Sequence, residues 1–203
     1  NLVLRSSLDL NYFKKKKTHS IRHKKINIAL LGNISPDKNI ELYFKIVNKF
    51  LSKKINFYLI GNLWKSQKKY FQIIKNRNYV AFKKIIWIEN NFEIKSLLDK
   101  IDLLICTSSN ESMPLSVCES LSMNIPVIST DVGDLRKIIY TKNLTSGIII
   151  NDSDSDSFVK HLEIILKNDI RFNLIKNNSR KLAIKFFDIR KYTNKLENLF
   201  FNI

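Results

Sequence analysis

Short apolar runs alternate with helical patterns from residue 26 onward, and this alternation constrains the fold more than any other feature of the chain. Each run has the length of a buried strand and is followed by a segment with helical periodicity. The predicted strands are residues 26–31, 55–60, 85–88, 103–106, 126–129 and 147–150. Such alternation forms a parallel sheet with right-handed crossovers and helices on both faces. We therefore predict an α/β fold, a Rossmann-like doubly wound parallel sheet of about six strands.

Helical periodicity fills the intervals between these strands and the stretch after the last one. In the first interval Ile40, Tyr43, Phe44 and Val47 share one face. The predicted helices are residues 37–51, about 64–75, 92–100, a helix that starts at Pro114, 133–139, and then about 155–167, 170–186 and 189–200. No internal repeat or long low-complexity linker indicates a second domain.

The net charge of +17 needs an interpretation before it is linked to a partner. The cations are 28 lysines and 7 arginines among many Asn and Ile residues, a mixture that an A- and T-rich genome also produces. The densest cluster, residues 14–17 with residues 22–25, precedes the first strand and is typical of a solvated linker. If it is functional, an anionic bilayer fits better than nucleic acid, because no helix-turn-helix, RNP-like or zinc-finger pattern accompanies it.

Other features bound the class of protein further. No apolar run reaches the ~18 residues of a membrane span, and no secretory-type N-terminus is present. Cys106 and Cys118 are interpreted as buried thiols in a reducing compartment rather than a disulfide. The histidines lack the spacing of zinc ligands, so we assign no metal site. The chain begins at Asn1 rather than Met, which is typical of a fragment.

Two glutamates eight positions apart, Glu111 and Glu119, follow the strand at 103–106. Pro114 marks a helix start, because its missing N–H is spared at the first helical position. Glu111 is therefore placed in a loop at the carboxyl end of a strand, and Glu119 lies more than one turn into the next helix. Ligands of open α/β sheets bind in that crevice, with anions at helix N-termini.

The glutamate pair resembles the Glu-x7-Glu signature of retaining GT-B-type glycosyltransferases, the nucleotide-sugar-dependent group often called family 4. Three further segments are similar to motifs of the family: residues 29–39, with Gly32 and Lys38; residues 57–61, a strand and glycine turn; and residues 130–139, the family's Thr-Asp-Val-Gly segment. The resemblance covers roughly residues 6–200, and it implies the C-terminal, donor-binding half of a GT-B fold.

The resemblance also implies roles for individual residues. Glu111 would hydrogen-bond hydroxyls of the donor sugar, and Glu119 would accept both hydroxyls of the nucleotide ribose. Lys38 would neutralise the donor diphosphate beside the Gly32 turn and stabilise charge as the sugar–phosphate bond breaks. If the resemblance is set aside, Glu111 is interpreted as a solvated loop carboxylate, Glu119 as an exposed helix residue and Lys38 as an ordinary first-turn lysine.

The chain departs from the family at two places. Asn33 stands where the family carries arginine, so the predicted diphosphate site has one positive charge fewer than in the family. Glu-Gly-Phe-Gly is common after the first glutamate, whereas this chain has Ser112, Met113 and Pro114 there. The backbone amides of Ser112, Met113 and Leu115 could still face sugar and phosphate, whereas Pro114 has no N–H to offer.

Residues 26–203 are thus predicted to form a nucleotide-sugar-binding domain, preceded by a linker and basic segment at 1–25. The resemblance implies sugar transfer with retention to a hydroxyl acceptor, glycan or lipid-linked, without metal or cofactor. It also implies a preceding acceptor domain, absent here, and a cytoplasmic location, with peripheral contact at the inner membrane face left open. The alternatives are a non-catalytic nucleotide-sugar-binding partner subunit or degenerate module, and a basic surface-binding protein.

Two remaining segments have simpler interpretations. Residues 152–163 imitate the ligand spacing of a calcium-binding EF-hand loop, but Ser157 replaces the required glycine and a strand precedes the segment. A helix N-cap with acidic first-turn residues explains this pattern. The last helix ends in apolar residues that would lean on the absent domain or drive dimerisation.

Overall fold

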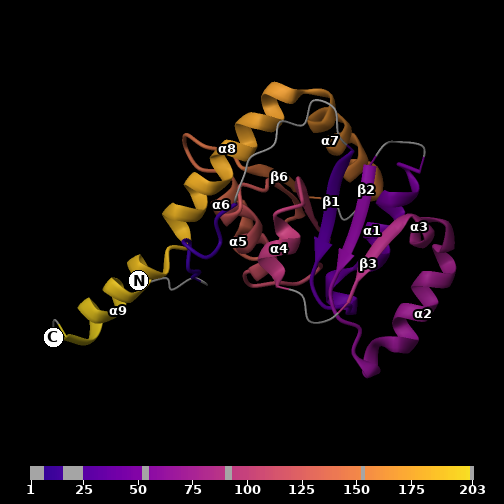
Figure 1. Ribbon diagram of the computed structural model, residues 1–203, viewed down its shortest axis with the longest axis horizontal. Coiled ribbons are helices and arrows are strands. Elements are labelled where there is room, and N and C mark those ends of the chain that lie inside the picture. The colour runs from indigo at the N-terminus through magenta and orange to yellow at the C-terminus, as the bar shows by residue number, and fades with distance from the viewer. Residues whose placement is uncertain (1–6, 16–24, 52–54, 90–92, 152–153, 202–203) are drawn as a thin grey trace.

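The computed structural model describes residues 7–15, 25–51, 55–89, 93–151 and 154–201, and it contains a six-stranded parallel sheet (Figure 1). The strands are β1 (Ile26–Leu31), β2 (Ile55–Ile60), β3 (Ile85–Ile88), β4 (Leu103–Cys106), β5 (Val127–Thr130) and β6 (Gly147–Ile150). Their order is β3-β2-β1-β4-β5-β6, and every pairing is parallel. The predicted doubly wound sheet is confirmed.

Helices follow the strands as the sequence pattern indicates. They are α1 (Ile40–Asn48), α2 (Lys68–Arg77), α3 (Tyr79–Lys84), α4 (Ile94–Leu98), α5 (Leu115–Ser122), α6 (Leu135–Ile139), α7 (Ser155–Lys167), α8 (Asp169–Phe186) and α9 (Ile189–Phe201). Two 3-10 turns, η1 (Pro36–Lys38) and η2 (Lys65–Gln67), precede α1 and α2.

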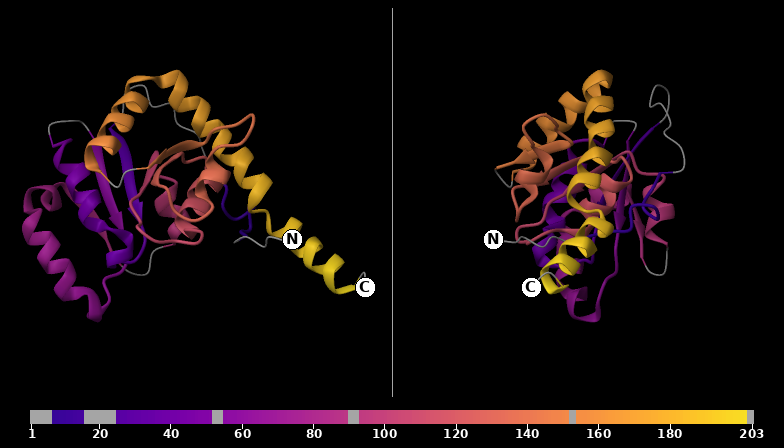
Figure 2. Two further views of the ribbon diagram at one scale, coloured as in Figure 1. Left: turned by 180° about the vertical axis from the view of Figure 1, so that it is seen from behind. Right: turned by 90° about the vertical axis from the view of Figure 1, so that its left-hand side faces the viewer.

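The strands are buried on both faces, which is why they appear in the sequence as continuous apolar runs. Alternate strand residues belong to two separate cores. Ile28 and Leu30 pack with α1, α2, α3 and α7, whereas Ala29 and Leu31 pack with α4, α5 and α6. Helix α8 contributes to both cores and contacts β6, so it closes that edge of the sheet (Figure 2).

Several helix ends differ from the prediction by a few residues, and three differences have an identifiable local cause. The helix predicted over 37–51 is split, because Asn39 adopts a left-handed backbone (φ 46°) between η1 and α1. Residues 79–84 form α3, which the sequence analysis missed; Asn78 interrupts the periodicity between α2 and α3. Pro114 is the N-cap of α5 rather than its first helical residue, with an extended backbone (ψ 115°).

Residues 7–15 of the predicted linker pack against the C-terminal helices. Leu8 pairs with Asp188, and the Arg180 guanidinium of α8 donates hydrogen bonds to the carbonyls of Leu10, Phe13 and Ser122. One arginine thereby ties the start of the chain to the end of α5. The rest of the basic cluster, residues 16–17 and 22–24, lies outside the described residues.

Helix α9 leaves the body of the domain, as Figures 1 and 2 show. Ile189 and Phe200 on this helix are 42% and 69% exposed. Nothing in the structure tests the predicted dimerisation through its end. Among the described helices, none combines the length and apolarity that crossing a membrane requires.

Candidate functional site

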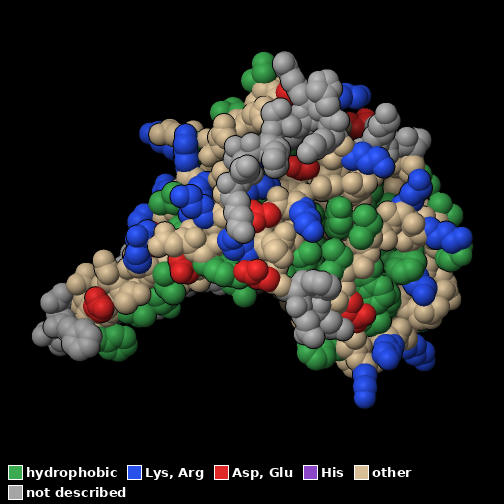
Figure 3. Space-filling model, viewed as in Figure 1, with side chains coloured by type: hydrophobic (Ala, Val, Ile, Leu, Met, Phe, Trp, Pro, Cys, Tyr) green, Lys and Arg blue, Asp and Glu red, His purple; other side chains and the backbone are tan. Residues whose placement is uncertain are grey.

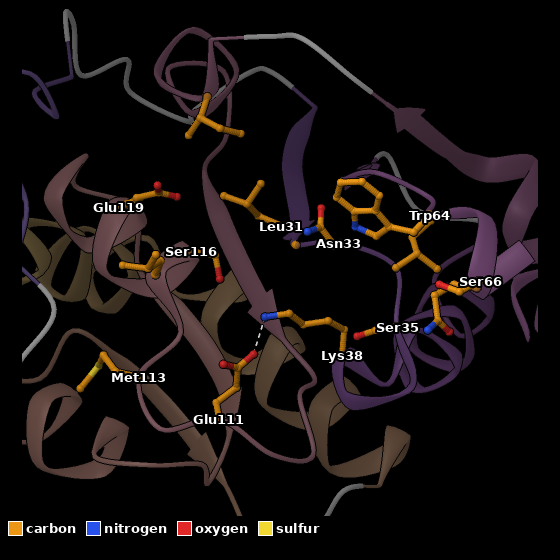
Figure 4. Close-up of a pocket in the computed structure, with 15 residues that line it drawn as sticks. Leu31, Asn33, Ser35, Lys38, Trp64, Ser66, Glu111, Met113, Ser116 and Glu119 are labelled. Atoms are coloured by element: carbon orange, nitrogen blue, oxygen red, sulfur yellow. Dashed lines mark hydrogen bonds and ion pairs between the residues drawn. The ribbon is translucent and has the colours of Figure 1, made fainter.

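A hollow of about 620 Å³ lies where the strand order reverses, beyond the carboxyl ends of β1 and β4. Loops leaving adjacent strands on opposite faces separate at this switch point, so an open sheet forms its ligand crevice here. The lining residues are Leu31, Gly32, Asn33, Ile34, Ser35, Lys38, Trp64, Ser66, Gln67, Ile94, Glu111, Met113, Leu115, Ser116 and Glu119 (Figure 4).

The loop after β1 supplies the cation of the hollow. Gly32 has a φ of +153°, a conformation that residues with a side chain rarely adopt. A Cβ there would lie 3.0 Å from Cε of Lys38, so the turn leaves room for the lysine to lie across it. Asn33 also lines the hollow but carries no charge.

The loop after β4 brings a carboxylate to that cation. Lys38 Nζ and Glu111 Oε1 form an ion pair, with 23% and 18% of their side chains exposed (Figure 4). The Ser108 hydroxyl also donates to Glu111 Oε1, at 3.3 Å. Partial burial and two donors hold the Glu111 carboxylate against Lys38 in the lining of the hollow.

Hydrogen bonds between loops fix the ion pair in place. The Thr107 hydroxyl donates to the Lys38 carbonyl at 2.8 Å, and the Ser109 amide donates to the Asp37 carbonyl at 2.8 Å. On the other side, the buried Thr130 hydroxyl donates to the Ser108 carbonyl. These hydrogen bonds connect the loops after β1 and β4 with each other and with the end of strand β5.

Helix α5 forms a further wall and carries Glu119. Burial raises the pKa of the Glu119 carboxyl to about 7. Figure 4 shows this carboxyl facing the hollow from the helix, beside Ser116. A carboxyl in this position can accept paired hydroxyl donors once it is ionised.

Two further segments that line the hollow were not predicted. Trp64, Ser66 and Gln67 come from the loop and 3-10 turn after β2, and Ile94 begins α4. Trp64 is 58% exposed, which is unusual for so large an apolar side chain. The only signal for it in the sequence is a tryptophan directly after a strand and its glycine turn.

The structure brings Lys38, Gly32, Asn33, Glu111, Met113, Leu115 and Glu119 together around this hollow. Ser112 is not among its lining residues. The Ser112 carbonyl instead lies against Gly133, so closely that a Cβ on Gly133 would be 1.9 Å from it. The Ser112 carbonyl thus supports the loop, and a contact of the Ser112 amide with sugar and phosphate stays a prediction.

The other polar candidates lie elsewhere. Cys106 and Cys118 are buried free thiols, as predicted, and burial raises the pKa of Cys118 to about 12. Asp154 is the N-cap of α7 and accepts from the amides of Asp156 and Ser157, which confirms the capping interpretation; residues 152–153 lie outside the described residues. In the described part of the chain, no three His, Cys, Asp or Glu residues are grouped as metal ligands.

Comparison with known proteins gives a family match over most of the chain. The sequence profile of the family described as "Glycosyl transferases group 1" matches residues 11–182. An Escherichia coli protein, the UDP-Gal:alpha-D-GlcNAc-diphosphoundecaprenol alpha-1,3-galactosyltransferase, is 24% identical over 196 residues. That match covers 93% of this chain and 49% of the relative, so the chain spans about half of the relative's length.

Solved structures share the fold. HepE of Anabaena, in complex with UDP, superposes with a TM-score of 0.86 at 14% identity, covering 100% of this chain and 57% of that one. The C-terminal domain of LpcC from Francisella tularensis, a glycosyl transferase group 1 family protein, gives a TM-score of 0.77 at 18% identity. The match covers 90% of this chain and 100% of that domain, so this chain has the fold of that C-terminal domain.

Proposed function

This chain belongs to the glycosyl transferases group 1 family, and from that premise we propose that its hollow binds the nucleoside diphosphate of an activated sugar. The observation that supports this most directly is the convergence of Lys38, Glu111 and Glu119 on one cavity of about 620 Å³. A cation suits the diphosphate, and two carboxylates suit sugar hydroxyls. This combination of one cation and two hydroxyl acceptors matches the parts of a sugar nucleotide.

In the proposed complex, Lys38 turns from Glu111 to the diphosphate and the freed carboxylate accepts hydroxyls of the sugar. Glu119 accepts the two hydroxyls of the ribose. The amides of Met113 and Leu115, at the start of α5, face the phosphates. Each assignment uses a group that already lines the hollow.

The chemistry we propose is transfer of the sugar with retained configuration to a hydroxyl acceptor, as in the family 4 enzymes. The leaving phosphate takes the proton of the incoming hydroxyl on the same face, so this chain needs to supply no general base and no metal. Its contribution is positioning and stabilisation of the charge that develops on the diphosphate. The acceptor, a glycan or a lipid-linked sugar, would be held by a second, N-terminal domain.

Calorimetry of this chain with UDP, GDP, ADP and UMP tests the proposal. We expect a diphosphate to bind at least about tenfold more tightly than its monophosphate, because Lys38 acts on the second phosphate. UDP is the first choice, since HepE is described in complex with it. Glu119→Ala should weaken binding by about tenfold. Equal affinity for UDP and UMP would contradict the assignment of Lys38.

A second reading, a non-catalytic binding module, is favoured by Asn33, which leaves Lys38 as the one cation among the lining residues that the structure describes. Joining the domain to its acceptor half and replacing Glu111 by Gln separates the two. An enzyme would lose turnover while still binding nucleotide, whereas a binding module would have no turnover to lose. Proton NMR of the product would report whether the anomeric configuration is retained.

A further inference from the structure

Away from the hollow, α2 and α3 present a surface that the packing of the domain does not require. Both helices face the core with Phe71, Ile74 and Ala81. Their outer side carries three exposed apolar residues among cations, and we call this set the α2–α3 stripe: Lys69, Ile73, Arg77, Tyr79, Val80, Lys83 and Lys84.

Spacing places these residues together. Lys69, Ile73 and Arg77 follow one another at intervals of four along α2, so they lie on one helical face. On α3, Tyr79 and Lys83 have the same spacing, and Lys83 Nζ lies 4.5 Å from the centre of the Tyr79 ring. Ile73, Tyr79 and Val80 are 44%, 52% and 58% exposed. Each of the two consecutive helices therefore exposes both apolar and cationic side chains.

The charge of this region has one sign. No Asp or Glu occurs between Glu41 and Glu89, an interval that contains all of α2 and α3. Burial, and then Glu41 and Asp37, raise the pKa of Tyr70, so the nearby carboxylates act on the first turn of α2. In Figure 3, blue and green side chains alternate over the edge where Figure 1 places these helices.

We propose that the α2–α3 stripe docks this domain on the surface of an anionic lipid bilayer. Anionic headgroups attract the cations, and the interfacial region accepts Ile73, Val80 and the amphipathic ring of Tyr79. A nucleic acid would use the cations and could stack on Tyr79, but it offers nothing to exposed Ile and Val side chains. The apolar members of the stripe therefore favour the bilayer.

Docking through this stripe would also determine where the hollow lies relative to the membrane. Ser66 and Gln67 of η2 line the hollow, and η2 runs directly into α2. The mouth of the hollow would therefore lie beside the membrane. The docking itself rests on α2 and α3, and it stands whether or not the hollow binds a nucleotide sugar.

Co-sedimentation with vesicles tests the apolar part of the proposal. The chain should bind phosphatidylcholine vesicles that contain about one third phosphatidylglycerol, release from them at high salt, and ignore pure phosphatidylcholine. Replacing Ile73→Ser together with Val80→Ser should weaken binding roughly tenfold. The matched control is Ile170→Ser with Leu174→Ser on α8, which are 84% and 59% exposed and should have no effect.

A second pair of variants, which lower the net charge equally, tests the cations of the stripe. Lys83→Gln with Lys84→Gln should weaken vesicle binding roughly tenfold, whereas exposed Lys160→Gln with Lys181→Gln should not. Circular dichroism melts should show that all variants remain folded. Equal losses in the two pairs, loss only when the lysines at 14–17 are replaced, or duplex DNA binding that depends on the same stripe would each overturn the proposal.

Discussion

The loops after β1 and β4 form two walls of the hollow, and they are supported in the same way but carry opposite charge. Each loop rests on a glycine from the neighbouring strand's loop. A Cβ on Gly61 would lie 1.9 Å from the Gly32 carbonyl oxygen, and a Cβ on Gly133 would lie 1.9 Å from the Ser112 carbonyl oxygen. The β1 wall then presents Lys38, and the β4 wall presents Glu111.

The two supports differ in backbone strain. Gly133 has a φ of +53°, so a side chain there would be both crowded and strained, whereas Gly61 does not have a positive φ and is limited by space alone. Close backbone approach therefore shapes both walls. We expect the β4 wall, which carries Glu111, to tolerate substitution at its supporting glycine less well than the β1 wall.

The largest expected effect follows from this difference. Gly133→Ala should lower the free energy of unfolding by about 3 kcal/mol or more, because it adds a collision with backbone to an unfavourable φ. Gly61→Ala should lower it by about 2 kcal/mol, from the collision alone. Urea denaturation of both variants measures the two values. If Gly61→Ala costs as much as Gly133→Ala, backbone strain does not distinguish the walls.

The sequence predicts the strands and the loops that carry Lys38 and Glu111, but it does not predict every segment that lines the hollow. Buried parallel strands are continuous apolar runs, so β1 and β4 and the loops that follow them were located correctly. The lining residues Trp64 and Gln67 come from the segment before α2, and Ile94 is the first residue of α4. Their approach to the hollow depends on how neighbouring crossovers are placed in space, which local periodicity does not encode.

Ser112 and α3 show two further limits. The sequence placed Ser112 next to Glu111 in a binding loop, but the close approach of Gly133 to its carbonyl depends on a contact distant in sequence. Helix α3 is short and follows directly on α2, so its pattern merged with the basic segment before it. Local sequence patterns therefore do not encode short elements or contacts between loops.

Lys38 provides the next test, because it is the feature that distinguishes the β1 wall. Lys38→Met should weaken binding of a nucleoside diphosphate by about tenfold to a hundredfold, since a hydrogen bond to a charged group is lost. Lys45→Met is the control: Lys45 lies on α1, pairs with Glu41 at 3.6 Å and is 55% exposed. Calorimetry should show an unchanged affinity for that variant. Equal losses would indicate general attraction by positive charge.

Through Glu119, a rise in pH should change the stability of the fold and the affinity for nucleotide in opposite directions. The folded-state pKa of Glu119, about 7, lies above the ordinary value of 4.5, so the folded protein holds the proton more tightly than the unfolded chain. Stability contributed by this group is therefore present below about pH 4.5 and is lost as the pH rises toward about 7. Nucleotide affinity should change the other way, because the ionised carboxylate is the better acceptor for ribose hydroxyls.

Glu119→Gln separates these two effects. At about pH 8 the variant should be more stable than the parent by about 1 kcal/mol, allowing for solvent screening, and at about pH 5 the two should differ less. Urea midpoints at both pH values measure this. Calorimetry should show that the parent binds a diphosphate more tightly at the higher pH and that the variant loses this dependence. A pH-independent difference in stability would mean that burial does not perturb this carboxyl.

The smallest expected effect concerns the hydrogen bond that joins the β4 loop to the β1 loop. The Thr107 hydroxyl, which belongs to the β4 loop, donates to the Lys38 carbonyl at 2.8 Å, and Thr107 is 1% exposed. Thr107→Val keeps the shape but leaves that carbonyl without this donor, so it should lower the free energy of unfolding by about 1 kcal/mol. Diphosphate affinity should fall only about twofold, because the turn that carries Lys38 is loosened while the lysine remains.

Ser109→Ala is the matched control for this joint. Ser109 is exposed, and its amide donates to the Asp37 carbonyl at 2.8 Å whatever the side chain, while its hydroxyl contact with that carbonyl is longer, at 3.3 Å. The variant should therefore change stability by less than about 0.5 kcal/mol. If Ser109→Ala instead costs as much as Thr107→Val, the walls are joined by surface contacts. The buried threonine would then not be what holds the cation of one loop against the carboxylate of the other.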